Sequence, residues 1–200
     1  MRDKYGVEQD PNCYQNTDIL INLLDIRSDS ELEEAELELT SFRLEQFSPQ
    51  FERLTFGYLK EIHHHLFQDI YKWAGQLRTI DISKGSTRFC TASNIEREAV
   101  KQFQRLAKSN YLRELSSAEF VFQLADFFCE MNVVHPFREG NGRTLRLFCE
   151  VLALQAGYEL DWKGISKDSW LEANIQGYLG NLAPLTMIFE KAANSLDFDE

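Results

Sequence analysis

The sequence predicts an all-α, single-domain protein with one short β-hairpin. Apolar residues recur at helical spacing over most of the 200 residues. There are only 10 Gly and 4 Pro, too few for a turn-rich all-β fold. No repeat or linker divides the chain, and this length can bury a single core. We therefore treat residues 1–200 as one domain, with its core at about 50–185.

The charge balance narrows the classes of ligand. The chain has 21 Lys+Arg and 32 Asp+Glu, a formal net charge of −11. A protein that binds nucleic acid directly usually has a basic surface, so a polyanionic ligand would need a local positive site. No apolar run reaches about 18 residues, and residues 1–12 lack the apolar segment of a secretory signal. With no CxxC pair among the four cysteines, we expect a cytoplasmic protein with free thiols and no membrane contact.

The first predicted helix runs from Ser28 to about Phe47, because Ser28 and Glu31 form a capping-box pattern. Its apolar face should comprise Leu32, Ala35, Leu39 and Phe42. Its glutamates, Glu33, Glu34, Glu36 and Glu38, are expected to face water.

The middle of the chain predicts two helices separated by the hairpin. Phe51–Gln68 has helical periodicity and contains His63, His64 and His65. Consecutive helix residues point about 100° apart, so these histidines should not converge on a metal. Between about 78 and 92, alternating apolar and polar residues surround a Gly-containing turn, which predicts a hairpin, and a helix should follow over about 92–108.

The last third predicts four helices. Ser116 and Glu119 form a second capping-box pattern, and the helix over Glu119–Val133 is apolar on nearly every side, as a central buried helix would be. Pro136 interrupts it. An apolar helix should then span Asn141–Ala156 and end at Gly157, before two weaker helices over about 167–178 and 182–196.

The chemistry-bearing residues are concentrated between the two apolar helices, in His135-Pro-Phe-Arg-Glu-Gly-Asn-Gly-Arg-Thr-Leu-Arg146. Three arginines and one glutamate give this segment a formal charge of +2 within an acidic chain. Gly140 and Gly142 can adopt positive φ and turn backbone N–H groups toward one point, and a helix N-terminus attracts anions. Arg143 and Arg146 share a helix face and can grip neighbouring phosphates.

Two further side chains complete this chemistry. Glu139 is a hard oxygen ligand that could hold Mg²⁺ if substrate phosphates supply the remaining ligands. His135 can accept a proton from an attacking hydroxyl. The residues alone thus predict a Mg²⁺-dependent nucleotide site for phosphoryl or nucleotidyl transfer.

At these residues the sequence resembles the Fic family, whose pattern H-P-F-x-(D/E)-G-N-G-R-x-x-R is matched at every defined position by His135–Arg146. The resemblance implies a Fic-fold domain of about eight helices with a hairpin flap at about 78–92 and an active-site loop and helix at 135–156. It implies a bacterial protein adenylyltransferase. Such an enzyme transfers AMP from ATP to a target-protein hydroxyl and releases pyrophosphate.

The resemblance also assigns roles to individual residues. His135 would be the general base and Glu139 the Mg²⁺ ligand. The backbone of Gly140–Gly142 and Asn141 would cradle the α- and β-phosphates, while Arg143 and Arg146 would grip the β- and γ-phosphates. The flap would align the target segment by strand-like pairing; its residues are Ile82, Ser83, Lys84, Gly85, Ser86, Thr87 and Arg88. Candidates for contact with the nucleotide base are Asn174, Gly177 and Asn181.

Many Fic proteins are restrained by a helix with the pattern (S/T)-x-x-x-E-(G/N). No stretch completes it here, and Ser30–Glu34, followed by Ala35, is the nearest miss. We therefore expect a toxin of a toxin–antitoxin pair, inhibited by a helix from a small separate antitoxin. Toxins of this class modify the ATPase subunits of DNA gyrase or topoisomerase IV.

Two alternatives remain at this stage. The motif does not read the base, so UMP, phosphate or phosphocholine transfer is open, although Gly142 and Arg146 favour AMP transfer over the kinase chemistry of Doc-like relatives. A catalytically silent binding module is disfavoured because the motif keeps its His and both arginines.

Overall fold

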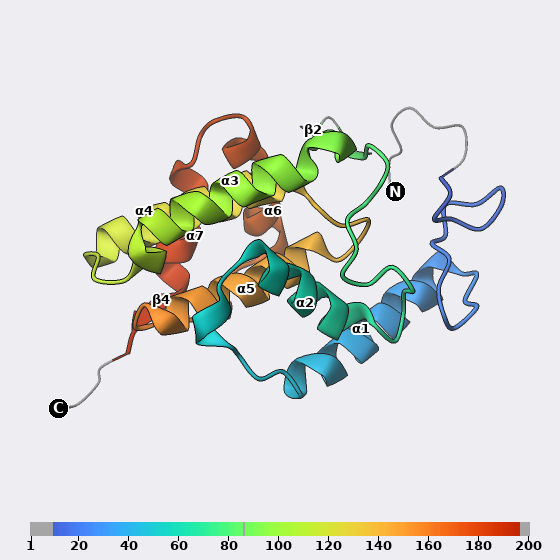
Figure 1. Ribbon diagram of the computed structural model, residues 1–200, viewed down its shortest axis with the longest axis horizontal. Coiled ribbons are helices and arrows are strands. Elements are labelled where there is room, and N and C mark those ends of the chain that lie inside the picture. The colour runs from blue at the N-terminus through green and yellow to red at the C-terminus, as the bar shows by residue number, and fades with distance from the viewer. Residues whose placement is uncertain (1–9, 86, 197–200) are drawn as a thin grey trace.

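The structure, a computed structural model, describes residues 10–85 and 87–196. Helices dominate this part of the chain, as predicted (Figure 1). The α-helices are α1 (Asp29–Glu45), α2 (Phe56–Phe67), α3 (Ile95–Lys108), α4 (Ser117–Val134), α5 (Asn141–Gln155), α6 (Lys167–Tyr178) and α7 (Ala183–Ala192). Short 3-10 turns are η1 (Phe51–Arg53), η2 (Ala92–Asn94) and η3 (Asn110–Leu112).

Helix α4 lies at the centre of the fold, as its apolar sequence predicts. It packs against α3, α5, α6 and α7, and α5 in turn packs against α2 (Figure 1). Eight of its side chains are buried, whereas Phe122 is 54% exposed. The segment His135–Gly140 joins the C-terminal end of α4 to the N-terminal end of α5, so the two most buried helices hold the motif between them.

The helix starts follow local capping chemistry only in part. The capping box predicted at Ser116 and Glu119 is confirmed, with both of its hydrogen bonds present. The capping box predicted at Ser28 is wrong. The Ser28 side chain makes no capping hydrogen bond, and its hydroxyl lies 3.1 Å from the Ser30 hydroxyl. Helix α2 begins at Phe56, later than predicted, because the Thr55 hydroxyl accepts the Tyr58 N–H at 3.2 Å.

Helix α1 does not present the predicted faces. Glu36, expected in water, is only 4% exposed, and Phe42, expected in the core, is 52% exposed. Leu32 is buried as predicted. The prediction failed because the partners that stabilise the buried carboxylate of Glu36 lie far along the chain, where helical periodicity gives no information about them.

Two small antiparallel sheets accompany the helices. The predicted hairpin forms from β1 (Ser83–Lys84) and β2 (Thr87–Arg88), with Ser83 opposite Arg88; Ser86 of the predicted flap lies outside the described residues. The second sheet was not predicted. It pairs β3 (Tyr158–Leu160) with β4 (Ala193–Ser195), so α7 ends earlier than expected. Gly157 takes φ +90° just before β3, as a residue after a helix end commonly does.

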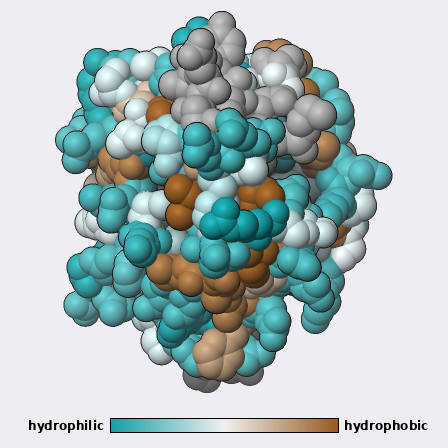
Figure 2. Space-filling model, turned by 90° about the vertical axis from the view of Figure 1, so that its right-hand side faces the viewer, coloured by the Kyte–Doolittle hydropathy of each residue, from teal (hydrophilic) through white to brown (hydrophobic). Residues whose placement is uncertain are grey.

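The surface on the side of α1 mixes polar and apolar side chains. Figure 2 views this side, and apolar side chains gather in its lower centre. Exposed large apolar residues in the N-terminal part of the chain include Ile21, Leu23, Leu24 and Leu37. Among the described residues, no helix combines the length and apolar character needed to cross a bilayer. All four cysteines are free thiols.

Candidate active site

The motif loop is bounded by two left-handed residues. His135, at φ +47°, ends α4, and Gly140, at φ +78°, precedes α5. A Cβ at Gly140 would lie 2.2 Å from Cζ of Phe67, so only glycine fits there. Gly142 differs, because it is helical and a Cβ there would meet nothing within 4 Å. The open space beside Gly142 leaves room for a ligand at the start of α5.

Asn141 closes the loop with its side chain. Its Oδ1 accepts the Phe137 N–H and its Nδ2 donates to the Phe137 carbonyl, each at 2.8 Å. The side chain is buried, and both ends of its amide are used. Asn141 therefore offers a ligand its backbone N–H, while its side chain fixes the shape of the loop.

The N-terminal end of α5 has unused backbone donors. The first hydrogen bond of the helix runs from the Thr144 N–H to the Gly140 carbonyl at 3.1 Å. Within the described chain, the N–H groups of residues 141–143 have no recorded acceptor. Three such donors, together with the positive end of the helix dipole, are the chemistry that phosphate oxygens need.

The proton on His135 can be assigned from its contacts. Its Nδ1 lies 3.1 Å from the Asn132 carbonyl, and because a carbonyl only accepts, Nδ1 carries the hydrogen. Nε2 then has a lone pair, the form a general base needs. Burial lowers the pKa of His135 to about 4, so the ring is neutral at pH 7.

Two residues outside the motif hold His135 in place. The ring of Phe89, just after β2, stacks on the imidazole at 3.7 Å between centroids. The buried guanidinium of Arg78 donates to the backbone carbonyls of His135 (2.8 Å) and Ile80 (2.7 Å), and also to that of Cys90. Arg78 thereby ties the base of the flap to the end of α4.

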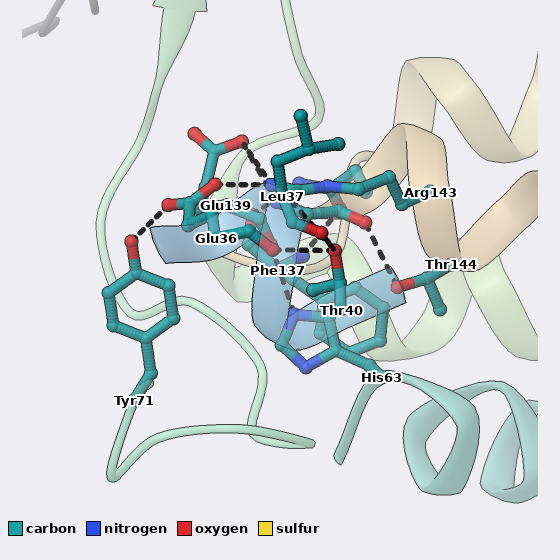
Figure 3. Close-up of polar contacts among 11 residues, drawn as sticks. Glu36, Leu37, Thr40, His63, Tyr71, Phe137, Glu139, Arg143 and Thr144 are labelled. Atoms are coloured by element: carbon teal, nitrogen blue, oxygen red, sulfur yellow. Dashed lines mark hydrogen bonds and ion pairs between the residues drawn. The ribbon is translucent and has the colours of Figure 1, made fainter. Parts of the chain in front are cut away.

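Arg143 is held from the other side by α1 (Figure 3). Its Nη2 forms an ion pair with the carboxylate of Glu36, which also accepts the Tyr71 hydroxyl. The guanidinium also lies over the Phe67 ring at 4.7 Å. Since Glu36 and Tyr71 are almost fully buried, this network fixes the direction of Arg143 at the start of α5.

Arg146 has no such partner. No hydrogen bond or ion pair to its guanidinium is recorded among the described residues, and its Cζ lies 5.6 Å from the centre of the Trp170 ring. Burial lowers its pKa, opposed by the carboxylate of Glu150. Glu34, the nearest match to an inhibitory glutamate, is exposed on α1. The glutamate of α1 that reaches the motif is Glu36, and it pairs with Arg143 instead.

Glu139 is placed by His63. The His63 Nδ1 accepts the Gly75 N–H at 2.8 Å, so its Nε2 carries the hydrogen and donates to the Glu139 carbonyl at 3.0 Å. The Glu139 carboxylate accepts the Gly140 N–H at 3.0 Å and is 29% exposed. Within the described ranges, no three His, Cys, Asp or Glu side chains gather as metal ligands. One carboxylate of this kind fits Mg²⁺ only when phosphate oxygens and water complete the shell.

The three residues predicted to contact the nucleotide base each contact a different part of the protein. The Asn174 Oδ1 accepts from the Asn132 amide at 2.9 Å. A Cβ at Gly177 would lie 2.9 Å from the Cys129 sulfur, so this glycine allows α6 to approach α4 closely. The Asn181 Oδ1 accepts the Ala183 N–H at 3.3 Å, at the start of α7. Their contact with a base stays a prediction.

Comparison with known proteins places this site in a family. Residues 53–153 match the Fic/DOC family. The chain belongs to the Fic/DOC family. It is 44% identical to "Probable protein adenylyltransferase Fic" of Escherichia coli K12 over 97% of each chain. It is 43% identical to the protein of the same name from Salmonella typhimurium LT2, over 96% of each chain.

Solved Fic structures share the fold. The BepC effector of Bartonella tribocorum, determined with bound AMPPNP, superposes with a TM-score of 0.85 at 27% identity and covers 93% of this chain and 97% of that one. An N-terminal Fic domain from Bartonella quintana, determined with bound ADP, gives 0.85 at 30% identity over 93% and 95%. The resemblance to the Fic family and the helical fold with a hairpin are thus confirmed.

Sequence reasoning missed the residues that support the motif, which include Glu36, His63, Tyr71, Arg78, Phe89 and Tyr178. From the sequence, Glu36 is assigned to a solvated helix face, and Tyr71 is given no element and no role. One signal was available for Glu36, because a glutamate at a helical position between Leu32 and Leu39 can fall on the buried face. The others contact the motif or the flap across long sequence separations.

Proposed function

We propose that this Fic protein is a protein adenylyltransferase that transfers AMP from ATP to a hydroxyl of a target protein. One observation carries the proposal most directly: neutral His135 keeps an Nε2 with no recorded partner among the described residues, and it begins the segment that leads into the start of α5. The names of its relatives support the AMP chemistry, and bound AMPPNP and ADP in similar structures support a nucleotide donor.

Different residues of this chain bind the ATP phosphates, hold the metal ion and accept the proton. The N–H groups of residues 141–143, with Arg143 and Arg146, bind and orient the ATP phosphates. Mg²⁺, held by Glu139 and the phosphates, would neutralise phosphate charge when bound. The target hydroxyl attacks the α-phosphorus and the bond to the bridging oxygen of pyrophosphate breaks. The proton of the hydroxyl passes to Nε2 of His135.

The flap supplies the position of the target. The backbone groups of Ser83, which lies opposite Arg88, have no recorded hydrogen-bond partner within the described part of the chain. An extended target segment could pair there and bring its hydroxyl to His135. Phe89, which belongs to the same hairpin, already touches the imidazole.

The experiment compares two labels. The purified protein is incubated with a bacterial lysate and either α- or γ-labelled ATP, with purified gyrase and topoisomerase IV as the first candidate targets. Label from the α-position alone supports AMP transfer, and γ-label alone supports a kinase. His135→Ala should abolish the signal, while His64→Ala, an exposed histidine of α2, should not. Labelling that persists in His135→Ala contradicts the assigned base.

The regulatory part of the proposal is a small antitoxin that acts in trans in the cytoplasm. In the described chain no ion pair or hydrogen bond to Arg146 is recorded, so its guanidinium could pair with an inhibitory carboxylate from another protein. Exposed apolar residues of α1 and the preceding segment, Leu37 at 67% among them, offer a surface for such a partner. The purified chain should then be active alone. If it is inert and Glu34→Gly activates it, inhibition acts in cis and this part fails.

A further inference from the structure

One face of α6 touches three separate parts of the candidate active site. Trp170, Asn174 and Tyr178 are spaced i, i+4 and i+8, so they lie along one side of the helix. Trp170 lies under Arg146, and Asn174 binds the side chain of Asn132, the residue whose carbonyl accepts from His135. Tyr178, at the C-terminal end of α6, reaches the flap.

The Tyr178 hydroxyl makes two hydrogen bonds to one residue of β2. It accepts the Arg88 N–H at 3.2 Å and donates to the Arg88 carbonyl at 3.1 Å. The hairpin register explains how one hydroxyl can serve both groups. The Lys84–Thr87 pair flanks the turn, so at the next pair, Ser83–Arg88, the backbone groups point outward. Tyr178 thus occupies the hydrogen-bonding edge of β2 at Arg88.

The tethered residue is adjacent to the one that contacts the base. Phe89 follows Arg88, and its ring stacks on His135 with an interplanar angle of 15°. The strands of the flap are only two residues long, and a hairpin of this size is marginally stable by itself. Arg78 holds the base of the flap, whereas Tyr178 holds β2 nearer to the turn.

We propose that Tyr178 is a positioning residue of the transfer reaction: its hydroxyl fixes β2 and thereby keeps Phe89 on His135 and the flap in register for the target. This inference rests on the proposed adenylyltransferase function. Tyr178 touches neither the phosphate-binding end of α5 nor Arg143 among its recorded contacts. Loss of the hydroxyl should therefore affect transfer to the target and spare ATP binding.

The test removes the hydroxyl alone. In Tyr178→Phe, the Arg88 N–H should exchange with deuterium about fivefold faster, as expected for the loss of one modest hydrogen bond. Tyr158→Phe is the matched control, because this tyrosine of β3 stacks on Phe120 and its hydroxyl has no recorded partner among residues 10–85 and 87–196. Amides of α4 should exchange at the wild-type rate in both variants. Unchanged exchange at Arg88 in Tyr178→Phe overturns the tether.

The catalytic arm uses α-labelled ATP and lysate proteins. Tyr178→Phe should lower the maximal labelling rate about fivefold while the apparent KM for ATP stays unchanged. Wild-type labelling in Tyr178→Phe, or an equal loss in Tyr158→Phe, overturns the positioning role. If the wild type transfers no α-label, the proposed function fails, and the exchange measurement still decides whether the tether exists.

Discussion

Two histidines, the buried His63 in α2 and the half-buried His135 at the end of α4, share a lowered pKa and a stacked ring but differ in how many of their nitrogens are hydrogen-bonded. Burial lowers the pKa of each to about 4, and each ring stacks on a phenylalanine, Phe137 at 3.9 Å and Phe89 at 3.7 Å. Both nitrogens of His63 are hydrogen-bonded, whereas for His135 the described part of the chain provides a partner to Nδ1 alone.

The difference shows that a shifted pKa does not identify the base in this site. His63 has no nitrogen left for a substrate, so it holds the Glu139 loop in place. His135 keeps Nε2, for which no partner is recorded among the described residues. The number of hydrogen-bonded nitrogen atoms thus separates His63, which has a structural role, from His135, which is available as a base.

The largest expected effect is the loss of transfer in His135→Ala. Removing a general base should lower the rate of AMP transfer about 10²–10⁴-fold, measured as α-label on target protein per unit time. Affinity for ATP should change little, because the recorded contacts of His135 are with Asn132, Phe89 and Arg78. A rate within tenfold of wild type would mean that another group takes the proton.

The corresponding change at His63 should act on stability. His63→Ala leaves a cavity and removes the partners of the Gly75 N–H and the Glu139 carbonyl, so the free energy of unfolding should fall by about 2–4 kcal/mol. Urea denaturation measures this loss. His64→Ala, at the exposed neighbour, should stay within about 0.5 kcal/mol of wild type. Equal effects of the two substitutions would remove the structural role of His63.

In acid the two histidines should behave alike. Each has an ordinary pKa of 6.5 when unfolded and about 4 when folded, so the unfolded chain binds more protons between these values. Stability is therefore fully present above about pH 6.5 and falls as the pH approaches 4, by about 3 kcal/mol per histidine. Urea denaturation at several pH values measures this decline. In His135→Ala, the slope of the unfolding free energy against pH should correspond to one proton fewer taken up on unfolding.

The pH dependence of the transfer rate gives a separate test of the lowered pKa of His135. Because His135 stays neutral above about pH 4, its protonation should not reduce the rate of transfer between pH 8 and 6. A rate that titrates with a midpoint near 6.5 would contradict the burial of the ring.

The sequence could predict which residues carry the proposed chemistry of this site, but not which residues hold them in place. His135, Glu139, Gly140, Arg143 and Arg146 fall within twelve consecutive residues, so their joint chemistry can be read directly. Glu36 is 107 residues from Arg143, and Tyr178 is 90 from Arg88. Such pairs form only when α1 and α6 pack, and helical periodicity carries no information about which side chain will meet which.

The secondary structure likewise contains elements that local sequence predicts and elements that only long-range pairing produces. Helix α4 and its cap were predicted because strong apolar content and a local capping box agree. The sheet of β3 and β4 was missed because Ala193–Ser195 continues the helical pattern of α7, and only pairing with the distant Tyr158–Leu160 makes it a strand. Tertiary contacts override local preference at such ends.

The smallest changes in activity and stability should come from substituting the two motif arginines. Like the two histidines, they differ in how far protein partners already use their polar atoms. Arg143 is paired with buried Glu36, whereas Arg146 has no recorded ion pair in the described chain. Arg143→Met should raise the KM for ATP and also lower the free energy of unfolding by about 1–3 kcal/mol, because the ion pair with the buried Glu36 carboxylate is lost. Arg146→Met, which keeps apolar contact with Trp170, should raise the KM with a stability change below about 1 kcal/mol.

A double substitution decides whether the stability loss in Arg143→Met comes from the carboxylate charge of Glu36. Adding Glu36→Gln removes that charge while keeping a side chain of the same size against Tyr71, so urea denaturation should show part of the stability restored. The KM for ATP should not recover, since no cation returns to the start of α5. If Glu36→Gln deepens the loss instead, Glu36 is stabilised mainly by Tyr71 and its other contacts, and the ion pair does not distinguish the two arginines.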